Sequence, residues 1–575
     1  MSEKYEQIDM FEFEERKPIK GFPELRWTGK RPYNSTQYYP AQLKEEYGSS
    51  DKDDWWNKIF WGDNLQVMSH LLKEYRGKVD LIYIDPPFDS KADYKMKITT
   101  KGKTVLNDSS LFEEKQYGDI WTNDEYLQFM YERLILLREL LSNSGTIYLH
   151  CDYRKVSHLR LIMDEVFGPD NFVNEIIWAY RTASGGKKEF NKQHDNILMY
   201  QKTSDRIFNE QKEKSYTKAK GRKAGIVNYG AANTEFFEDD DGVYRWSSMR
   251  DVWDIPYINS QALERLGYPT QKPEALISRI IEASSNPGDI VFDCFMGSGT
   301  TQAVAMKLGR KFIGADINLG AVQTTTKRLN NILKESTNQL FGEKMTGFKV
   351  YNVNNYDFFR NPVVARDLLI EALNIQPFSQ RKIFDGELDG RNVKIMPVNR
   401  IATKADLKEL IANLPYASYD KKKEDNPGQP VDYITLVCMG HEPDLLASFK
   451  QEVSSYKIDV EIVDILTDKK DLEFKREAKA DVTIEGDQLV VKSFYPMNLM
   501  QKLSLQKEQI SDYKQLVESI VIDWNYDGSV LKPSVIDIPD KKDFVKGTYT
   551  IPENRGVIRV KITDLLSESL EVEVE

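Results

Sequence analysis

Short runs of apolar residues alternate with amphipathic stretches from Ile59 onward, which is typical of strand–helix–strand units. The clearest runs are Val79–Ile84, Thr146–His150, Asp289–Phe292 and Lys311–Ala315. Turn residues flank them, and continuous apolar runs of this length are typical of parallel strands that are buried on both faces. The pattern therefore predicts an α/β fold built on a mostly parallel sheet.

Helices are predicted between these strands. A capping box at Thr122–Glu125 begins one helix, which should run to about Leu141 and end at the turn residues 142–145. A second should span Val156–Phe167. A third should have Pro273 in its first turn and end near Ser285, and a fourth should run from Thr300 to Leu308.

Two regions break this rhythm. Residues 181–268 are polar and look like an insertion. After about residue 345, apolar alternation predicts a strand-rich mixed domain, with strands at Val431–Met439, Val460–Leu466, Val482–Phe494, Ile520–Trp524 and Val557–Ile562. The charged run at 420–428 is predicted to be an exposed linker or loop. The expected domains are thus an N-terminal extension (1–57), two halves of a core (58–180 and 269–340), the insertion (181–268) and a C-terminal α+β domain (345–575).

Composition narrows the class of protein. The chain has 575 residues, of which 40% are hydrophobic and 29% charged, as in soluble globular proteins with more than one domain. Its cysteines (Cys151, Cys294 and Cys438) are far apart, which argues against a disulfide framework or a zinc site. No apolar run approaches the roughly 20 residues of a membrane span, and the acidic N-terminus lacks a signal pattern. We therefore expect a reduced, cytoplasmic protein with no membrane association. The net charge of −11, taken alone, argues against a nucleic-acid partner.

The first candidate for chemistry is the tetrapeptide Asp85-Pro86-Pro87-Phe88, directly after a predicted strand. Open α/β folds bind ligands at the carboxyl ends of their strands. A carboxylate, an outward-pointing proline carbonyl and an aromatic face together suit a planar ring that carries an exocyclic amine. The alternative is an ordinary Asp-Pro turn.

The second candidate is Asp293-Cys-Phe-Met-Gly-Ser-Gly-Thr300, between a predicted strand and a helix. Glycines at such a junction let a ligand approach the backbone N–H groups at the start of the helix. Asp316, at the end of the following strand, can accept hydrogen bonds from ribose hydroxyls. Because no full G-x-G-x-x-G is present, the loop suits a nucleoside with a smaller charged tail better than a dinucleotide.

The order of these motifs, DPPF, then TQKP (Thr270–Pro273), then DCFMGSGT, resembles the permuted β class of amino-methylating DNA methyltransferases over about residues 55–335. The resemblance implies a Rossmann-like, S-adenosylmethionine-dependent methyltransferase core, with a target-recognition insertion between its halves. It implies that the C-terminal domain serves dimer, DNA or partner contacts. The small departures are Phe88, where tyrosine is commoner, and Met296 within the glycine loop.

The same resemblance assigns residues to roles. Asp85, Pro86, Pro87 and Phe88 would bind the flipped target base and its amine. Asp316 would bind the cofactor's ribose, Lys272 would reach its carboxylate, Asp293 would support the loop and Asp63 would lie near the adenine. The full cofactor set is Asp63, Thr270, Lys272, Pro273, Asp293, Phe295, Gly297, Gly299, Thr300 and Asp316. No metal is expected.

In this family an Asp-Pro-Pro start usually accompanies adenine-N6 methylation, with cytosine N4 as the alternative. The size of the chain resembles the modification subunit of type III restriction-modification systems. Such subunits usually form homodimers and pair with a separate translocase–nuclease. The other possibilities are a stand-alone methyltransferase, a methyltransferase of another defence system with the same core, and a catalytically silent DNA-binding scaffold that keeps the fold.

Residues 181–223 carry twelve Lys or Arg and five Asp or Glu, a local net charge of +7. Double-stranded DNA is the expected partner of this segment, and a solvated loop is the alternative. The residues expected to contact DNA are Lys187, Lys188, Lys192, Lys218, Lys220, Arg222 and Lys223. His150, His158 and His194 are expected to be packing, surface or structural residues. The net charge is thus an uninformative average, because residues 1–15 and 561–575 carry eleven acids and two lysines.

Overall fold

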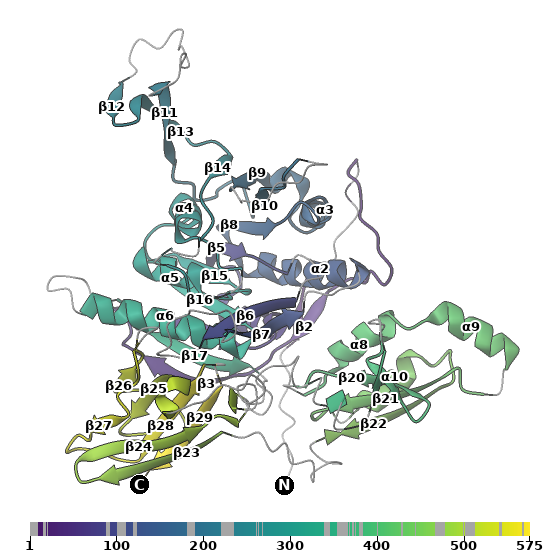
Figure 1. Ribbon diagram of the computed structural model, residues 1–575. Coiled ribbons are helices and arrows are strands. Elements are labelled where there is room, and N and C mark those ends of the chain that lie inside the picture. The colour runs from purple at the N-terminus through teal and green to yellow at the C-terminus, as the bar shows by residue number, and fades with distance from the viewer. Residues whose placement is uncertain are drawn as a thin grey trace.

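The structure is a computed structural model, and Figure 1 shows its arrangement. It describes residues 10–574 apart from 15–18, 20, 88–92, 100–110, 119–122, 181–189, 220–234, 260–261, 263, 267, 269, 338–344, 354–365, 367–368, 371–372, 374, 379–382, 399–400, 427–428, 443, 466–477, 498, 501–511, 540–542 and 566–567. The predicted capping box at Thr122 begins within a segment outside this description.

A ten-stranded sheet forms the core. Its order is β14 (Val252–Asp254), β9 (Phe172–Ala179), β10 (His194–Gln201), β8 (Leu141–Cys151), β5 (Val79–Ile84), β15 (Ile290–Asp293), β16 (Lys311–Asp316), β4 (Asn57–Trp61), β17 (Phe348–Val353) and β3 (Ala41–Tyr47). The strands from β8 to β17 are parallel, whereas β10 is antiparallel to both of its neighbours and β3 is antiparallel to β17. The predicted parallel α/β core is confirmed.

In the described part of the chain, three helices cover each face of this sheet. On one face α1 (Asn64–Tyr75), α2 (Asn123–Leu140) and α3 (Val156–Phe167) pack on the strands, and on the other α4 (Glu274–Ser284), α5 (Thr300–Lys307) and α6 (Leu319–Thr337) do so. Successive residues of β5 alternate between the two cores, since Ile82 and Ile84 join the first and Leu81 and Tyr83 the second. This burial on both faces explains the continuous apolar runs in the sequence.

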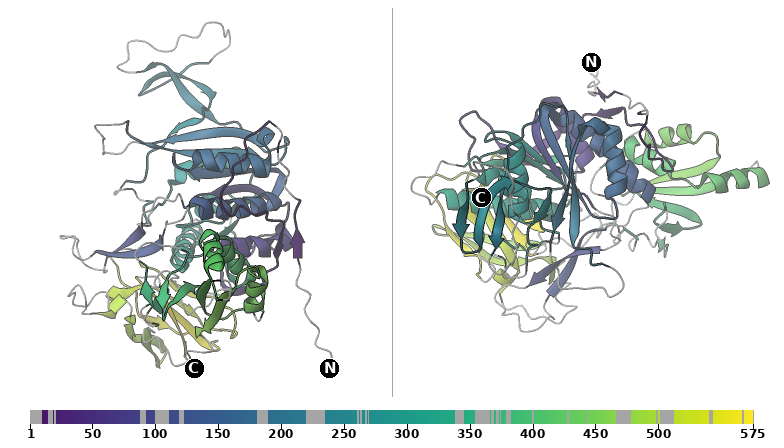
Figure 2. Two further views of the ribbon diagram at one scale, coloured as in Figure 1. Left: turned by 90° about the vertical axis from the view of Figure 1, so that its right-hand side faces the viewer. Right: turned by 90° about the horizontal axis from the view of Figure 1, so that it is seen from above.

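The insertion contributes both to the sheet and to an arm. Strands β9, β10 and β14 extend the sheet, while β11 (Lys212–Ala219), β13 (Gly242–Ser248) and β12 (Phe237–Asp239) form a three-stranded sheet of their own. Figures 1 and 2 show this small sheet projecting from the body as an arm. Two further antiparallel pairs are β1 (Met10–Glu12) with β2 (Ser35–Gln37) and β6 (Asp93–Thr99) with β7 (Leu111–Gly118).

The C-terminal region contains two units rather than one. The first is a sheet of β18 (Gln376–Pro377), β19 (Gly386–Leu388), β20 (Arg391–Ile395), β21 (Asp432–Cys438) and β22 (Ile458–Asp464), with helices α8 (Lys404–Ala412), α9 (Tyr416–Asp425) and α10 (Leu445–Glu452). The second consists of β23 (Lys479–Glu485), β24 (Gln488–Tyr495) and β27 (Thr548–Thr550) together with β26 (Val535–Asp537), β25 (Val517–Asp523), β28 (Ile558–Asp564) and β29 (Ser569–Val574). Each unit has its own buried apolar cluster.

Three expectations need correction. The charged run that begins at Asp420 lies in α9 as far as Asp425, because lysine and glutamate are good helix formers even on an exposed surface. The core sheet extends past residue 345 through β17, and it takes β3 from the N-terminal extension. The run Val482–Phe494 contains two strands joined at Gly486, whose φ of +64° permits the tight turn.

Among the described residues, no helix is both long and apolar enough to cross a membrane. All three cysteines are buried and have free thiols.

Candidate active site

A pocket of about 280 Å³ opens where β4, β5, β15 and β16 end. Because parallel strands end at one edge of a sheet, the polar residues that follow them converge there. Its wall contains Asp63, Asn64, Tyr83, Asp85, Pro87, Phe129, Tyr268, Thr270, Lys272, Ile277, Asp293, Cys294, Phe295, Met296, Gly297, Ser298, Thr300, Asp316, Ile317 and Asn318.

Asp85 is the carboxylate at the end of β5, and its two oxygens differ. The Lys272 ammonium is ion-paired with Oδ2. Oδ1 is buried and has no hydrogen-bond partner among the described residues. A buried carboxylate oxygen without a donor is unfavourable by about 1–3 kcal/mol or more, so this atom is suited to accept a hydrogen bond from a bound ligand.

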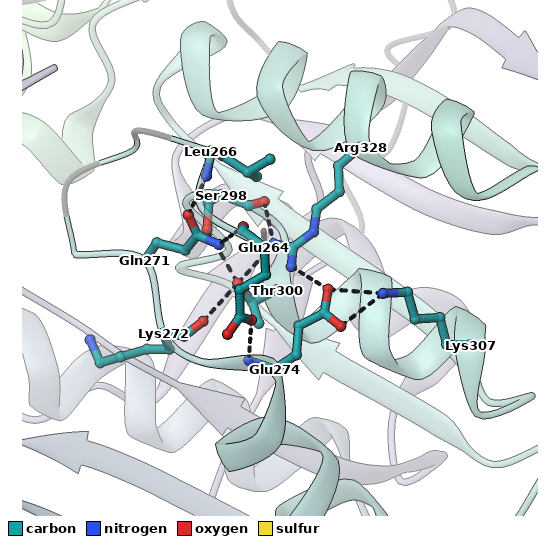
Figure 3. A network of polar contacts seen from close by, with 9 residues as sticks. All are labelled: Glu264, Leu266, Gln271, Lys272, Glu274, Ser298, Thr300, Lys307 and Arg328. Carbon is teal, nitrogen blue, oxygen red and sulfur yellow. Dashed lines mark hydrogen bonds and ion pairs between the residues drawn. The ribbon is translucent and has the colours of Figure 1, made fainter. Parts of the chain in front are cut away.

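The loop that carries Lys272 is held by the network in Figure 3. The Gln271 side chain donates to the Glu264 carbonyl (2.6 Å) and accepts from the Leu266 N–H (2.9 Å). Thr270 has a φ of +65°, a backbone conformation rarely adopted by a residue with a β-branched side chain. The loop is therefore held by its surroundings in a conformation that its own sequence does not favour.

A second set of contacts in Figure 3 ties this loop to the glycine-rich turn. The Thr300 hydroxyl donates to the Lys272 carbonyl (3.3 Å) and accepts from Arg328 (2.9 Å). Arg328 also donates to Glu274 (2.7 Å) and to the Ser298 carbonyl (3.2 Å). The two predicted cofactor motifs thus form one connected structure, although Arg328 belongs to neither.

The glycines of the turn are required by their conformation. Gly297 and Gly299 have φ values of +50° and +70°. A Cβ on Gly299, which precedes the first residue of α5, would lie 2.5 Å from Thr325. A Cβ on Gly297 would lie 3.3 Å from the Tyr268 ring, on the pocket wall. The turn consequently brings backbone close to the pocket, as the sequence predicts.

Asp293 lies beneath this turn. It accepts hydrogen bonds from the Phe295 N–H (2.9 Å) and the Thr301 hydroxyl (2.7 Å). Burial raises the pKa of Asp293 to about 7, against the opposing effect of these two donors. Its contacts are those of a residue that supports the loop.

Asp316 ends β16 and faces the pocket. The Gly297 N–H donates to one of its oxygens (2.9 Å) and the Asn318 N–H to the other (2.8 Å). Burial raises the pKa of Asp316 to about 6, although these backbone donors oppose the shift. The Ile317 N–H is a third backbone donor to this carboxylate. The two oxygens have about four acceptor sites between them, so the carboxylate can still accept a hydrogen bond from a hydroxyl group.

Asp63 has two functions in the fold. Its side chain caps α1 by accepting from the Leu65 and Gln66 N–H groups (3.0 and 3.4 Å). Arg133 also donates to it (3.3 Å) and lies over the Phe129 ring at 3.4 Å from the centroid. Phe129 in turn lies 6.2 Å from the ring of Phe295. The Asp63 end of the pocket is therefore walled by aromatic rings.

Most of the site residues predicted from sequence come together here. Of the cofactor set, Pro273 and Gly299 are not in the pocket wall; they precede the first residues of α4 and α5. Asp85 and Pro87 are in the wall and Pro86 is not, while Phe88 lies outside the described residues. Lys272 differs most from expectation, because it is ion-paired with Asp85.

Sequence reasoning missed several wall residues. Phe129 comes from the middle of helix α2, and neither Tyr268 nor Asn318 belongs to a recognised motif. Ile317 is 42% exposed beside Asp316, where it offers an apolar surface. The aromatic and apolar side chains needed to cover a planar ring carry no signal in local sequence, because such residues are common in any core.

The residues expected to contact DNA are mostly outside the described part of the chain, namely Lys187, Lys188, Lys220, Arg222 and Lys223. Lys192 lies 5.1 Å from the centroid of the Tyr153 ring, and Lys218 belongs to β11 in the arm. The arm also exposes Phe237 and Trp246.

Comparison with known proteins identifies the family. A DNA methylase family model matches residues 79–327. The chain is 30% identical to the DNA adenine methyltransferase YhdJ of Escherichia coli over 280 residues, which cover 47% of this chain and 82% of that protein. This chain belongs to the DNA methylase family. Because the match covers 82% of YhdJ, the assignment rests on more than the separate motifs.

Other members of the family extend the comparison. The chain is 29% identical to the type II methyltransferase M.EcaI of Enterobacter cloacae, covering 56% of this chain and 82% of that protein. It is also 29% identical to the type III StyLTI Mod subunit of Salmonella typhimurium, covering 44% and 50%. The match thus spans only half of that Mod subunit. The solved complex of M1.HpyAVI with S-adenosylmethionine aligns with 48% of this DNA methylase and 98% of its own chain (22% identity, TM-score 0.30).

The cofactor of this DNA methylase is S-adenosylmethionine, and the pocket fits it. Gly297 leaves room in the pocket wall that a Cβ would fill, Asp316 supplies an acceptor for hydroxyls, and rings lie at the Asp63 end. These features suit a nucleoside that carries a charged amino-acid tail.

Proposed function

We propose that this DNA methylase transfers a methyl group to adenine N6 in a base flipped out of double-stranded DNA. The observation that carries the proposal is the buried Oδ1 atom of Asp85, a residue of the pocket wall, which has no donor among the described residues. An exocyclic amine is the kind of donor from which such an oxygen atom would accept a hydrogen bond. Asp85, Pro86, Pro87 and Phe88 would together hold the base.

Asp85 would prepare the amine for reaction. The N6 lone pair is conjugated with the ring, which makes it a poor nucleophile. A hydrogen bond from N6 to Asp85 Oδ1, and a second to the Pro86 carbonyl, would favour the pyramidal and more nucleophilic amine. Lys272 would keep Oδ2 engaged, so that the other oxygen faces the base. Holding the reacting atoms in line supplies much of the rate by proximity.

Other residues would hold the cofactor, whose sulfonium supplies an electrophilic methyl group. Asp316 would accept from the ribose hydroxyls, and Phe129, Phe295 and Ile317 would pack on the planar ring. Asp63 would lie at the same end, and Asp293 would keep the glycine turn in shape. Thr270 and Lys272 would lie near the methionine part, with Pro273 beginning the helix behind them.

The base has to leave the stack to reach this pocket, at a cost of about a few kcal/mol. The insertion is the segment that would contact the surrounding DNA, because its residues 181–223 are strongly basic. The arm adds exposed aromatic side chains at Phe237 and Trp246. Stacking on bases and contact with phosphates are the interactions that this composition supports.

Adenine is favoured over cytosine by the Asp-Pro-Pro start and by similarity to YhdJ, which is named as an adenine methyltransferase. Similarity to the StyLTI Mod subunit favours a modification component of a type III-like restriction-modification system. In that setting the chain would be a cytoplasmic homodimer that pairs with a restriction subunit. Light scattering after gel filtration should then give twice the mass of one chain.

The test is a methylation assay on amplified, and therefore unmethylated, genomic DNA of the host, with tritium-labelled cofactor. Mass spectrometry of the digested DNA should detect N6-methyldeoxyadenosine. Detection of N4-methyldeoxycytidine instead would overturn the choice of base. Cofactor binding without any methylation would favour a silent scaffold.

An Asp85→Asn variant is the matched control, since it keeps the shape of the side chain and removes its charge. It should bind the cofactor with nearly unchanged affinity by calorimetry. Its methyl transfer should fall at least about 100-fold, the scale of a group that acts directly on the reacting atoms.

A further inference from the structure

Three hydrogen-bonded side chains lead from the pocket wall into the sheet. The Tyr83 oxygen lies 2.9 Å from His150 Nδ1, and His150 Nε2 lies 3.2 Å from Asp195 Oδ2. The residues come from three adjacent strands, β5, β8 and β10. The proposed function assigns nothing to His150 or to the strand that begins at His194.

The direction of the hydrogen bonds follows from the charge of Asp195. Burial acts to raise its pKa, but the hydrogen bond from His150, the charge of Lys272 and the Tyr180 hydroxyl (3.2 Å) hold this pKa below its ordinary value. Ionised Asp195 can only accept, so Nε2 of His150 carries a hydrogen. In the tautomer that carries its one hydrogen on Nε2, Nδ1 of His150 can accept the hydrogen of the Tyr83 hydroxyl.

The two ends of this hydrogen-bonded series of side chains have different surroundings. Tyr83 is in the pocket wall, two residues before Asp85 on the same face of the strand and about 7 Å from it along the backbone. His150 is fully buried, with the Trp178 ring packed edge-on at 5.5 Å. The Asp195 side chain is 15% exposed and is not in the pocket wall. The hydrogen-bonded side chains thus connect the pocket to the Asp195 carboxylate, which solvent reaches from outside the pocket.

We propose that Tyr83, His150 and Asp195 carry away the proton that methyl transfer releases, an inference that rests on the proposed function. The amine nitrogen forms its bond to carbon as the methyl–sulfur bond breaks, and the electron pair of that bond stays on sulfur. The nitrogen is left with one proton too many. That proton passes to Asp85 Oδ1 and then, through water in the pocket whose wall contains both residues, to the Tyr83 oxygen.

The remaining steps keep the same balance. As the Tyr83 oxygen gains a proton, its own O–H proton passes to His150 Nδ1. His150 becomes an imidazolium that Asp195 stabilises, and its Nε2 proton leaves to solvent by way of Asp195. This leaves His150 with its hydrogen on Nδ1. Once the DNA has left, a proton that passes the other way along the same side chains, to solvent in the open pocket, restores the hydrogen on Nε2. The sequence predicts that His150 is a packing or surface residue; in the structure it is buried, and both of its ring nitrogens are hydrogen-bonded.

Tyr83→Phe tests the inference, because it removes one hydroxyl and keeps the ring. Tyr148→Phe is the matched control: Tyr148 is equally buried in the same core, and its hydroxyl bonds only Ser284 (2.7 Å) among the described residues. Single-turnover methylation of unmethylated genomic DNA should slow about 10- to 100-fold in Tyr83→Phe and less than about twofold in Tyr148→Phe. The Kd for the cofactor should be unchanged in both.

Two further measurements distinguish proton transfer from packing. Asp195→Asn should slow the step similarly, and the double variant Tyr83→Phe/Asp195→Asn should be no slower than the slower single variant, since both interrupt one route. In His150→Gly, added imidazole should restore the rate, whereas 1,2,4-triazole, of similar size and much weaker basicity, should not. Imidazole should also fail when Tyr83→Phe is combined with His150→Gly.

The outcomes separate this inference from the proposed function. Absence of methylation by the unaltered chain contradicts the function itself. Normal methylation by Tyr83→Phe, additive effects of the two single variants, or equal rescue by triazole would each overturn the proton route while leaving the function in place. If His150→Gly does not fold, the double variant still decides.

Discussion

Lys272 is ion-paired with Asp85 across a sequence separation of 187 residues. The pair joins the motif expected to bind the cofactor to the motif expected to bind the base. Both side chains are mostly buried, with exposures of 11% for Lys272 and 16% for Asp85. Lys272 therefore fixes which oxygen of Asp85 remains to receive a ligand.

Replacing Lys272 by methionine should lower the free energy of unfolding by about 1–3 kcal/mol, because neither Asp85 oxygen would then have a donor among the residues that the structure describes. Lys307→Met is the matched control: it breaks an ion pair with Glu274 in which Lys307 is 42% exposed, and such pairs contribute about 0–1 kcal/mol. Urea denaturation measures both. Adding Asp85→Asn to Lys272→Met should recover stability, because the unpaired charge is removed. If Lys272→Met is as stable as the unaltered protein, the Lys272–Asp85 ion pair does not form.

Local sequence was sufficient to predict the strands and turns of the site. The apolar runs before Asp85 and Asp293, and the glycines after Asp293, determine a backbone conformation within a few residues, and the structure has those elements. Helix α3 spans Val156–Phe167 as predicted, since Gly168, with a φ of +91°, and Pro169 end it locally.

Contacts between distant strands were not predictable in the same way. His150 and Asp195 meet because β10 returns antiparallel beside β8, with Asn196 opposite Cys151. Nothing in the sequence near either residue specifies that order of strands. The Lys272–Asp85 pair likewise depends on the packing of two loops, so the resemblance assigned Lys272 to a different partner.

Stability should depend on pH through Asp293. Its folded-state pKa of about 7 is raised above the unfolded value of about 3.9, so the folded protein binds the extra proton between these values. The contribution of Asp293 to the free energy of unfolding consequently falls as pH rises from about 4 to 7 and is constant above that. Asp293→Asn, which keeps the shape and the acceptor for the Phe295 N–H, should lack this dependence.

The measurement is urea denaturation of both proteins at several pH values. The stability of the unaltered protein relative to Asp293→Asn should decline toward neutral pH by on the order of a few kcal/mol. A difference that stays constant across this range would contradict a raised pKa for Asp293.

Cofactor affinity should depend on pH through Asp316. Its pKa of about 6 in the free protein leaves a large fraction protonated at pH 5, and the ionised form is the better acceptor for two hydroxyls. Affinity for S-adenosylmethionine should therefore rise, by up to about tenfold, between pH 5 and 7. Calorimetry should find that Asp316→Asn binds the cofactor more weakly and that its affinity changes little between pH 5 and 7. If Asp316→Asn shows the same pH dependence as the unaltered protein, another group is responsible for it.

The glycine turn offers a comparison of two substitutions. Gly299 and Gly309 have nearly the same φ, +70° and +71°, so alanine introduces similar backbone strain of about 1 kcal/mol at each. Only at Gly299 would the new Cβ meet another residue, Thr325, at 2.5 Å, while nothing lies within 4 Å at Gly309. Gly299→Ala should therefore lower the free energy of unfolding by about 1–3 kcal/mol more than Gly309→Ala, the usual range for overpacking. It should also weaken cofactor binding, because the turn has to move. Adding Thr325→Ala to Gly299→Ala should recover part of the lost stability and part of the lost cofactor affinity. If Gly299→Ala and Gly309→Ala lower the free energy of unfolding equally, the turn is less tightly packed against Thr325 than the structure implies.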